Sequence, residues 1–228
     1  MTSQPSDTAT VFDLALAQLA LGDYAPIRYV YTATISGLIN DYLYSDNVKV
    51  TTYQNAFKRA IQEAFYPAFE QGLEDGGGEV PAQGDDLAWV NAKAEAERGF
   101  SDMLWQQLKE LKAEQRAEDE AAKKENRQAE NLFAGVGDAR AAGYARTLDA
   151  VYSEGKIRGA KNQMLTFGGS DGEESCDTCQ KLKGARHRAS WWKNHGLIPG
   201  QPGNSQYECG GFRCQHVLFS DKGEIFTV

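Results

Sequence analysis

Cysteine and histidine are absent from the first 175 residues of this 228-residue chain. All four cysteines and all three histidines lie between Cys176 and His216, so any thiol or imidazole site has to be built in the last quarter. The chain also lacks an uninterrupted apolar run of about 18 residues, which a membrane-spanning helix needs. We therefore expect no contact with a membrane.

A secretion signal is not evident either. The most apolar early stretch, Val11–Leu21, is interrupted by Asp13 and Gln18, and no basic region precedes it. We predict a short helix there and expect the protein to be in the cytoplasm, where it is made. Because that compartment is reducing, its cysteines are more often metal ligands or plain thiols than disulfides.

Basic residues are outnumbered in the first two-thirds of the chain. Residues 1–150 hold 14 Lys and Arg against 24 Asp and Glu, whereas residues 151–228 hold 10 against 8. The acidic portion argues against nonspecific wrapping of DNA, because phosphate binding needs a cationic surface. A solvated acidic helical surface is the simplest explanation of this charge.

Helical patterns fill the acidic portion. Phe57, Ile61, Phe65 and Phe69 recur every four residues and predict one buried helix face. A loop is expected over residues 72–84, and further helices are expected from Pro26 to Tyr44, from Asp85 or Asp86 to about Asn131, and from Asp138 to about Leu165. From Lys109 onward the helix expected to end near Asn131 is mostly charged, which indicates either a solvated spacer or a helix packed on a partner subunit.

The last quarter shows no helical period and has few aliphatic side chains. Short strands are expected near Arg186–Ala189 and Val217–Ser220. A piece of this size cannot bury enough apolar surface to fold alone, so it needs a staple. We therefore predict a mainly α protein, with an elongated acidic helical portion over residues 1–170 and a small α+β zinc-binding module over residues 171–228.

The cysteines are placed to provide that staple. Cys176 and Cys179 form a C-x2-C pair, and Cys209 and Cys214 form a C-x4-C pair. Each pair lets two sulfurs on one tight turn reach the same metal, and four thiolates in a tetrahedron suit Zn2+. A site closed in this way leaves no position for a catalytic water, so we expect a structural Zn2+ and no enzyme.

Other interpretations of the cysteines and histidines stay open. A redox C-x2-C usually opens a helix after a strand, whereas this one follows a Gly-rich loop. A cysteine nucleophile with His187 or His195 as its base lacks an evident orienting partner. His216 lies two residues after Cys214 and is an alternative ligand in place of one cysteine, while His187 and His195 are expected to be surface or hydrogen-bonded residues.

Basic and aromatic side chains are interleaved from Lys181 to Lys193. Five cations and two adjacent tryptophans occur there without an acid. Such a patch can bind single-stranded nucleic acid, which makes a zinc-ribbon nucleic-acid-binding protein the alternative function. It can also dock on an acidic protein. We favour the plainer interpretation, in which Trp191 or Trp192 fills the small core beside the metal and the charges are solvated.

Three segments carry a resemblance to a known family. They are YARTLDAVYSEGKIRGAKNQM from Tyr144, ESCDTCQKLKGARH from Glu174 and YECGGFRCQHVLF from Tyr207. With a helix, a C-x2-C pair, Gly184 and an Arg-Cys ending in this order, about residues 136–220 resemble phage head morphogenesis proteins, the Mu F-like, SPP1-type minor head proteins. Many members carry Pro-x-His before the final cysteines, whereas this chain has Pro199 and Pro202 without that histidine.

The resemblance implies a minor structural and assembly protein of a tailed-phage head, made in the host cytoplasm and located in the virion at the portal vertex or capsid interior. It implies portal or capsid subunits as partners and several copies per virion. Packaged DNA is a further partner if the Lys181–Lys193 patch binds it. If the missing histidine is a ligand in relatives, either His216 takes its role here or the role is lost.

Overall fold

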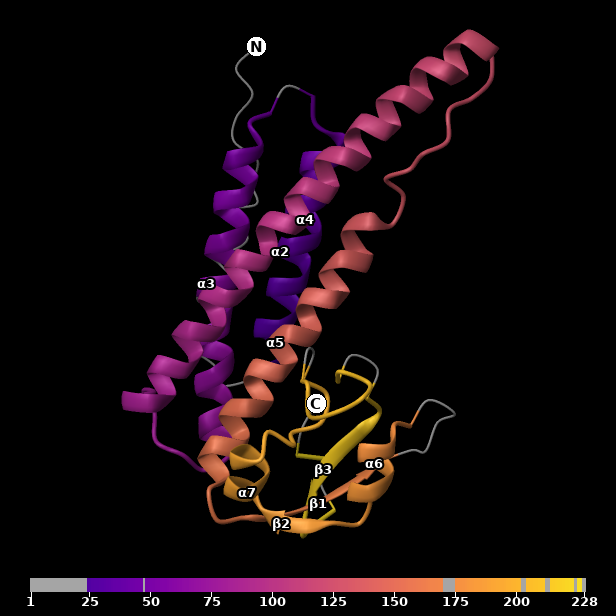
Figure 1. The fold of residues 1–228 in the computed structure, drawn as a ribbon. Coiled ribbons are helices and arrows are strands. Elements are labelled where there is room, and N and C mark those ends of the chain that lie inside the picture. Colours follow the sequence, from indigo (N-terminus) through magenta and orange to yellow (C-terminus); the bar gives the residue numbers. More distant parts are fainter. Residues whose placement is uncertain are drawn as a thin grey trace.

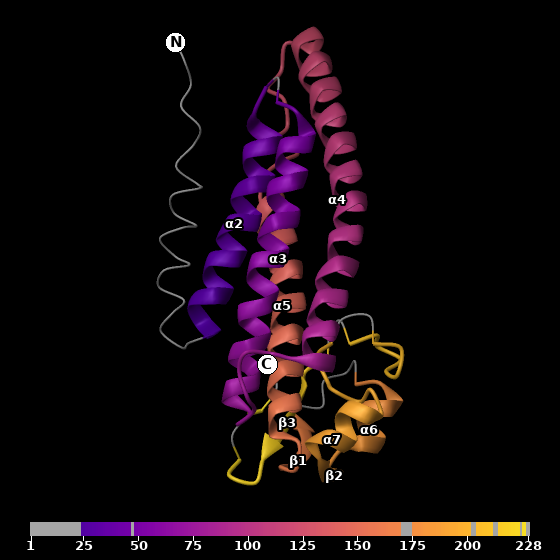
Figure 2. The same cartoon turned by 90° about the vertical axis from the view of Figure 1, so that its left-hand side faces the viewer.

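The computed structural model describes residues 24–46, 48–169, 175–201, 204–211, 214–223 and 225–226. Four long helices form the first part of the fold. They are α2 (Tyr24–Tyr44), α3 (Val50–Asp75), α4 (Gly84–Glu125) and α5 (Val136–Ala160). The four helices form one elongated bundle, in which α3 and α5 share the largest interface (Figures 1 and 2). The helix predicted at Val11–Leu21 lies outside the described residues.

The aromatic stripe of α3 is confirmed as the centre of this bundle. Phe57, Ile61, Phe65 and Phe69 are fully buried, among apolar side chains that come from all four long helices. Trp105 of α4 meets Phe57 edge-on, with 5.7 Å between the ring centroids. Each of these large side chains contributes about 1.5–3 kcal/mol by leaving water, so the stripe accounts for the position of α3 between its neighbours.

Glycines bring α3 and α5 into unusually close contact. Gly72 in α3 and Gly76, the residue directly after that helix, lie against α5, whose Gly155 and Gly159 face the end of α3, so each side carries a G-x3-G pair. A Cβ atom on Gly155 would lie only 2.2 Å from the carbonyl oxygen of Phe69. No larger residue fits between the two backbones, and such close approach also permits Cα–H···O contacts between the helices.

The long helix α4 extends past α2 and α3 at the end of the bundle away from the sheet (Figure 1). Its 42 residues span about 63 Å at 1.5 Å per residue. The mostly charged half binds its own return segment: the Gln115 amide donates to the carbonyl oxygen of Glu130 at 2.8 Å and accepts from the N–H of Leu132 at 2.7 Å. Arg127 pairs with Glu118 at 2.5 Å. The chain thus folds back along α4 before α5 begins.

Several predicted helix ends are wrong. The expected loop at residue 72 begins later, because α3 continues to Asp75. α4 ends at Glu125 rather than near Asn131, because Asn126 takes a left-handed conformation with φ of 54°. α5 ends at Ala160 instead of Leu165. The residues before α4 and α5 are Gln83 and Gly135, so the expected capping aspartates lie in the first turns, where carboxylates still interact favourably with the helix dipole.

A three-stranded antiparallel sheet follows α5. Its order is β2-β1-β3, with β1 (Met164–Gly169) in the centre, β2 (Arg186–Arg188) on one edge and β3 (His216–Ser220) on the other. Leu165 and Phe167 of β1 point to the same face and are buried, together with Leu218 of β3. They form a second apolar core that also includes Ile157 and Ala160 from the end of α5. The division of the chain at residue 170 remains a prediction.

Two short helices were not expected. They are α6 (Asp177–Leu182) and α7 (Ala189–Asn194), each of six residues. The strands expected near residues 186 and 217 occur as β2 and β3, whereas β1 occupies residues predicted as helix end and loop. The fold is therefore mainly α, with a small C-terminal sheet, as predicted. None of the helices in the described part of the chain has the length and apolar character to cross a membrane.

Candidate metal centre

Four thiols converge beside the edge of the sheet. Cys176 immediately precedes α6 and Cys179 lies in its first turn. Cys209 lies in a turn closed by the N–H of Gly210 and the carbonyl of Tyr207, 2.8 Å apart, and Cys214 comes two residues before β3. The cysteines of the two motifs pair across the centre, with Sγ–Sγ distances of 3.7 Å for Cys176–Cys209 and 3.8 Å for Cys179–Cys214.

These distances are too long for disulfide bonds. A disulfide needs about 2.05 Å between sulfurs, and all four cysteines are free. Two overlapping groups have ligand atoms within 4.8 Å of one another: Cys176, Cys179 and Cys209 form one, and Cys179, Cys214 and His216 form the other. The structure therefore brings all four predicted cysteines and His216 together as a cluster that could bind a metal ion.

The other two histidines lie outside these groups. His187 and His195 both stack on Trp191, with ring centroids 3.7 and 4.1 Å away. Two rings this close cannot share one face of the indole, so they occupy opposite faces. His195 Nδ1 also lies 2.8 Å from the carbonyl oxygen of Trp191. The expectation that these histidines are hydrogen-bonded or surface residues agrees with this arrangement.

A carboxylate clamps the two cysteine motifs to each other. Glu208, next to Cys209, accepts hydrogen bonds from the backbone N–H of Thr178 at 3.1 Å and from its hydroxyl at 2.9 Å. Thr178 lies between Cys176 and Cys179. Sequence reasoning missed this contact, because nothing in the local pattern links residues 30 positions apart.

Aromatic rings support the cluster from the core side. Phe167 of β1 stacks with Trp192, Tyr207 and His216, at centroid distances of 5.9, 6.5 and 5.2 Å. Trp192 is fully buried, and its indole N–H donates to the carbonyl oxygen of Leu165 at 3.2 Å. The predicted plugging of the small core by a tryptophan is thus the role of Trp192.

Burial governs the electrostatics of the thiols. It raises the pKa of Cys179 and of Cys209, and neighbouring thiols raise both pKa values further. Burial also acts on Cys176, but hydrogen bonds from the backbone N–H groups of Cys179 and Cys209 outweigh it and lower the pKa of that thiol. Like-charged thiolates in one place repel each other, so a bound cation is the natural way to ionise all of them together.

The predicted basic patch is partly neutralised within the module. Arg186 forms an ion pair with Asp221 at 2.7 Å, and Arg188 donates to the side chain of Asn162 at 3.1 Å. With Trp192 buried and both faces of Trp191 covered, neither tryptophan of the patch presents a bare ring face on which a base could stack.

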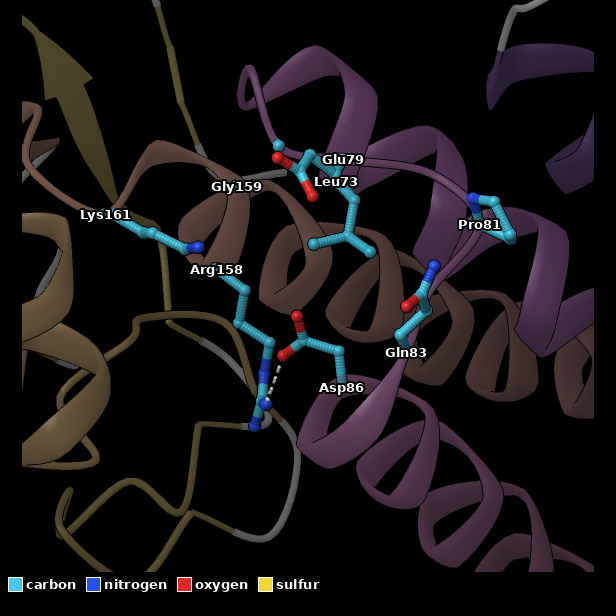
Figure 3. A pocket seen from close by; sticks show the side chains of 9 residues that line it. Leu73, Glu79, Pro81, Gln83, Asp86, Arg158, Gly159 and Lys161 are labelled. Carbon is cyan, nitrogen blue, oxygen red and sulfur yellow. Dashed lines mark hydrogen bonds and ion pairs between the residues drawn. The ribbon is translucent and has the colours of Figure 1, made fainter.

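A small polar pocket lies between the end of α3, the loop that follows it, the start of α4 and the end of α5. Its volume is about 110 Å³, and Figure 3 shows Arg158 and Asp86 joined across it by an ion pair of 2.9 Å. Glu79 and Lys161 line the same pocket. Two acids and two bases therefore line it, and Arg158 and Asp86 already pair with each other.

Arg158 belongs to a buried network that links the module to the bundle. Its Nε donates to Glu154 at 2.7 Å, and the other carboxylate oxygen of Glu154 accepts from Gln201 at 3.0 Å. Arg158 and Glu154 are almost completely buried, and the guanidinium lies over the ring of Trp89 at 5.0 Å. The segment that leads to Cys209 is thereby tied to α5.

Fold and site together define a mainly α-helical protein with a cysteine-rich C-terminal module that could bind a metal ion. A scan against protein-family models and searches of curated proteins and of solved structures each found no match.

Proposed function

We propose that the C-terminal module is held together by one structural Zn2+ ion bound to Cys176, Cys179, Cys209 and Cys214. The spacing of the sulfurs carries this proposal. In a tetrahedron with metal–sulfur bonds of about 2.3 Å, neighbouring sulfurs lie about 3.8 Å apart. The two cross-motif pairs have 3.7 and 3.8 Å.

The small size of the second core supports a structural role for the ion. Among the described residues, eleven buried side chains make up that core, and one of them is a cysteine of the site. Metal binding to such a module supplies folding free energy directly, because the unfolded chain has no preformed site. Four thiolates also complete the coordination of Zn2+, so the proposal includes no catalytic activity.

Elemental analysis of the purified chain tests this proposal. We expect one zinc per molecule, retained on gel filtration, and four thiols that react with a disulfide reagent only after a chelator is added. A folded chain without metal and with four thiols that react at once would overturn it.

For the whole chain we propose a role as a minor structural and assembly protein of a tailed-phage head, in contact with portal or capsid subunits. The resemblance over about residues 136–220 supports this role. The shape of the molecule is compatible with it, since a long helical bundle offers extended surface to other subunits (Figure 2). The partly neutralised basic patch makes the nucleic-acid-binding alternative the weaker one.

Cosedimentation tests the head role. We expect the chain to sediment with purified phage heads at a fixed, low copy number that survives a salt wash. A chain found only in the soluble fraction of the lysate would contradict this role while leaving the metal site intact.

A further inference from the structure

The cysteine cluster holds five donor atoms for four tetrahedral positions. Cys176, Cys179 and Cys209 form one close group, so a single position remains for Cys214 or His216. Both lie near Cys179, and both belong to the segment that enters β3. Which of them binds the metal decides the charge of the site, because four thiolates around Zn2+ carry a net charge of −2 and three carry −1.

The imidazole of His216 is directed toward the neighbouring sulfur. Its Nδ1 lies 3.8 Å from Cys214 Sγ, which is within hydrogen-bond range for a sulfur acceptor. Cys214 Sγ in turn lies 3.8 Å from Cys179 Sγ, close to the expected edge of a zinc tetrahedron. The spacing of the two sulfurs therefore favours Cys214 as the ligand, with the imidazole of His216 beside its sulfur.

Packing and strand pairing fix the position of this ring in the module. His216 is only 4% exposed, and its ring stacks on Phe167 at an interplanar angle of 20°. Its backbone pairs with Gly169 of β1. Gly169 has φ of 139°, and a Cβ atom there would lie 2.8 Å from the Cα of His216, so the glycine lets the two strands meet at this point.

We propose that His216 is a positioning residue of the metal site, whose Nδ1–H donates a hydrogen bond to the thiolate of Cys214. This inference rests on the proposed Zn2+ site. A partly buried site with a net charge of −2 needs donors around its sulfurs, because charge that is removed from water has to be compensated. Groups that hydrogen-bond to metal ligands orient them, and their loss typically costs about 10- to 100-fold in metal affinity.

The His216→Phe variant tests the proposal. Phenylalanine keeps the stack on Phe167 and removes the donor, and His195→Phe makes the same chemical change at an exposed ring away from the cluster. The chains are loaded with Co2+, whose charge-transfer absorption reports the number of bound thiolates, and with Zn2+, whose affinity is measured by competition with a chelator. Alkylation followed by mass spectrometry identifies the thiol that reacts first.

We expect His216→Phe to bind one metal ion with an unchanged four-thiolate spectrum, to bind Zn2+ about 10- to 100-fold more weakly, and to react first at Cys214. His195→Phe should match the parent chain, and His216→Asn, whose amide can donate, should recover part of the affinity. If His216→Phe fails to fold, the His216→Asn and parent chains carry the same comparison.

Three results would overturn the proposal. A three-thiolate spectrum in the parent chain, or a spectrum altered by His216→Phe, would make His216 a ligand. Unchanged affinity and alkylation in His216→Phe would leave the residue without a role at the metal. If the parent chain binds no metal, the proposed Zn2+ site itself is wrong. The first two results both require a bound metal, so they would overturn the role of His216 alone.

Discussion

At the scale of single residues, Glu97 of α4 has an unfavourable charge. Burial raises the pKa of its carboxyl group, and Lys93 one turn earlier only partly opposes this shift. The charge of Glu97 also contributes to the raised pKa values of Tyr31 and Tyr144, so the carboxylate lies among phenols of α2 and α5. The hydroxyl of Tyr31 is buried and makes no hydrogen bond within the described residues.

The sign of the pKa shift predicts a stabilising substitution. The folded pKa of Glu97 lies above its unfolded value, so the fold favours the protonated carboxyl group. The stability that this group contributes is complete below about pH 4 and is lost as pH rises through the folded pKa. Glu97→Gln should therefore raise the free energy of unfolding at pH 7.5, and the gain should vanish near pH 4. Urea unfolding followed by circular dichroism measures both values. The exposed Glu110→Gln is the control, and an equal gain at both pH values would contradict the prediction.

The clamp between Glu208 and Thr178 is the second residue-scale case. The carboxylate accepts its own backbone N–H and both donors of Thr178, and these bonds lower the pKa of Glu208 to about 2. Glu208→Gln removes the charge that accepts these bonds and loosens the hold of one cysteine motif on the other. We expect zinc release to a chelator to become roughly 10-fold faster.

Asp221→Asn is the matched control for this clamp. Asp221 is an exposed carboxylate of the same module, but its partner is Arg186 and not a cysteine motif. Equal release rates in Glu208→Gln and Asp221→Asn would show that the clamp does not position the cysteines.

At the scale of elements, the glycine pairs decide how α3 and α5 pack. Gly155→Ala places a methyl group against the carbonyl of Phe69, and backbone cannot move aside as a flexible side chain can. We expect the free energy of unfolding to fall by about 1–3 kcal/mol, as for other overpacked sites. Gly143 lies on the exposed face of α5, where an added Cβ atom would have nothing within 4 Å. Gly143→Ala should therefore raise the free energy of unfolding by up to about 1 kcal/mol through helix propensity.

Urea unfolding of the two alanine variants checks this contrast in one helix. Opposite signs of the two changes are the expected result. If Gly155→Ala were as stable as Gly143→Ala, the two helices would have room to separate, and the close contact would contribute little to the stability of the bundle.

The elements also show what the sequence could and could not predict. The stripe from Phe57 to Phe69 is periodic over several turns, so the buried face of α3 was predictable. The end of α5 was not, because Lys161 stops it with φ of 22° and neither glycine nor proline announces the stop. Leu165 and Phe167 then continue the apolar pattern of α5, so the pattern alone does not indicate that a strand begins there.

The candidate site divides in the same way. The spacings C-x2-C and C-x4-C predicted that two thiols lie on each of two turns, because a tight turn is a local property. The short helix after Cys176 has six residues, too few for a helical period to appear. The contacts of Glu208 with Thr178 and of His216 with Phe167 depend on how distant segments pack, and no local pattern encodes them.

At the scale of the whole molecule, two cores meet along α5. The larger core includes Val151 and the smaller one begins at Ile157, so one continuous helix contributes to both. Gln201 and Glu154 add a hydrogen bond between the module and that helix. The bundle has a large aromatic core of its own, whereas the module has few buried side chains and, in our proposal, one metal ion.

Metal removal should therefore unfold one end of the molecule and spare the other. In zinc-finger peptides, structural zinc supplies about 10–16 kcal/mol of binding free energy, far more than so small a core can replace. With a chelator present, hydrogen exchange read by mass spectrometry should show fast exchange in β1 and β3 and in α5 beyond Ile157. The amides of α3 and of α5 before Val151 should stay protected, because their aromatic core and glycine contacts contain no metal ligand. Loss of protection throughout α3 would mean that the bundle depends on the module for its stability, and unchanged protection in β1 would mean that the module folds without its metal.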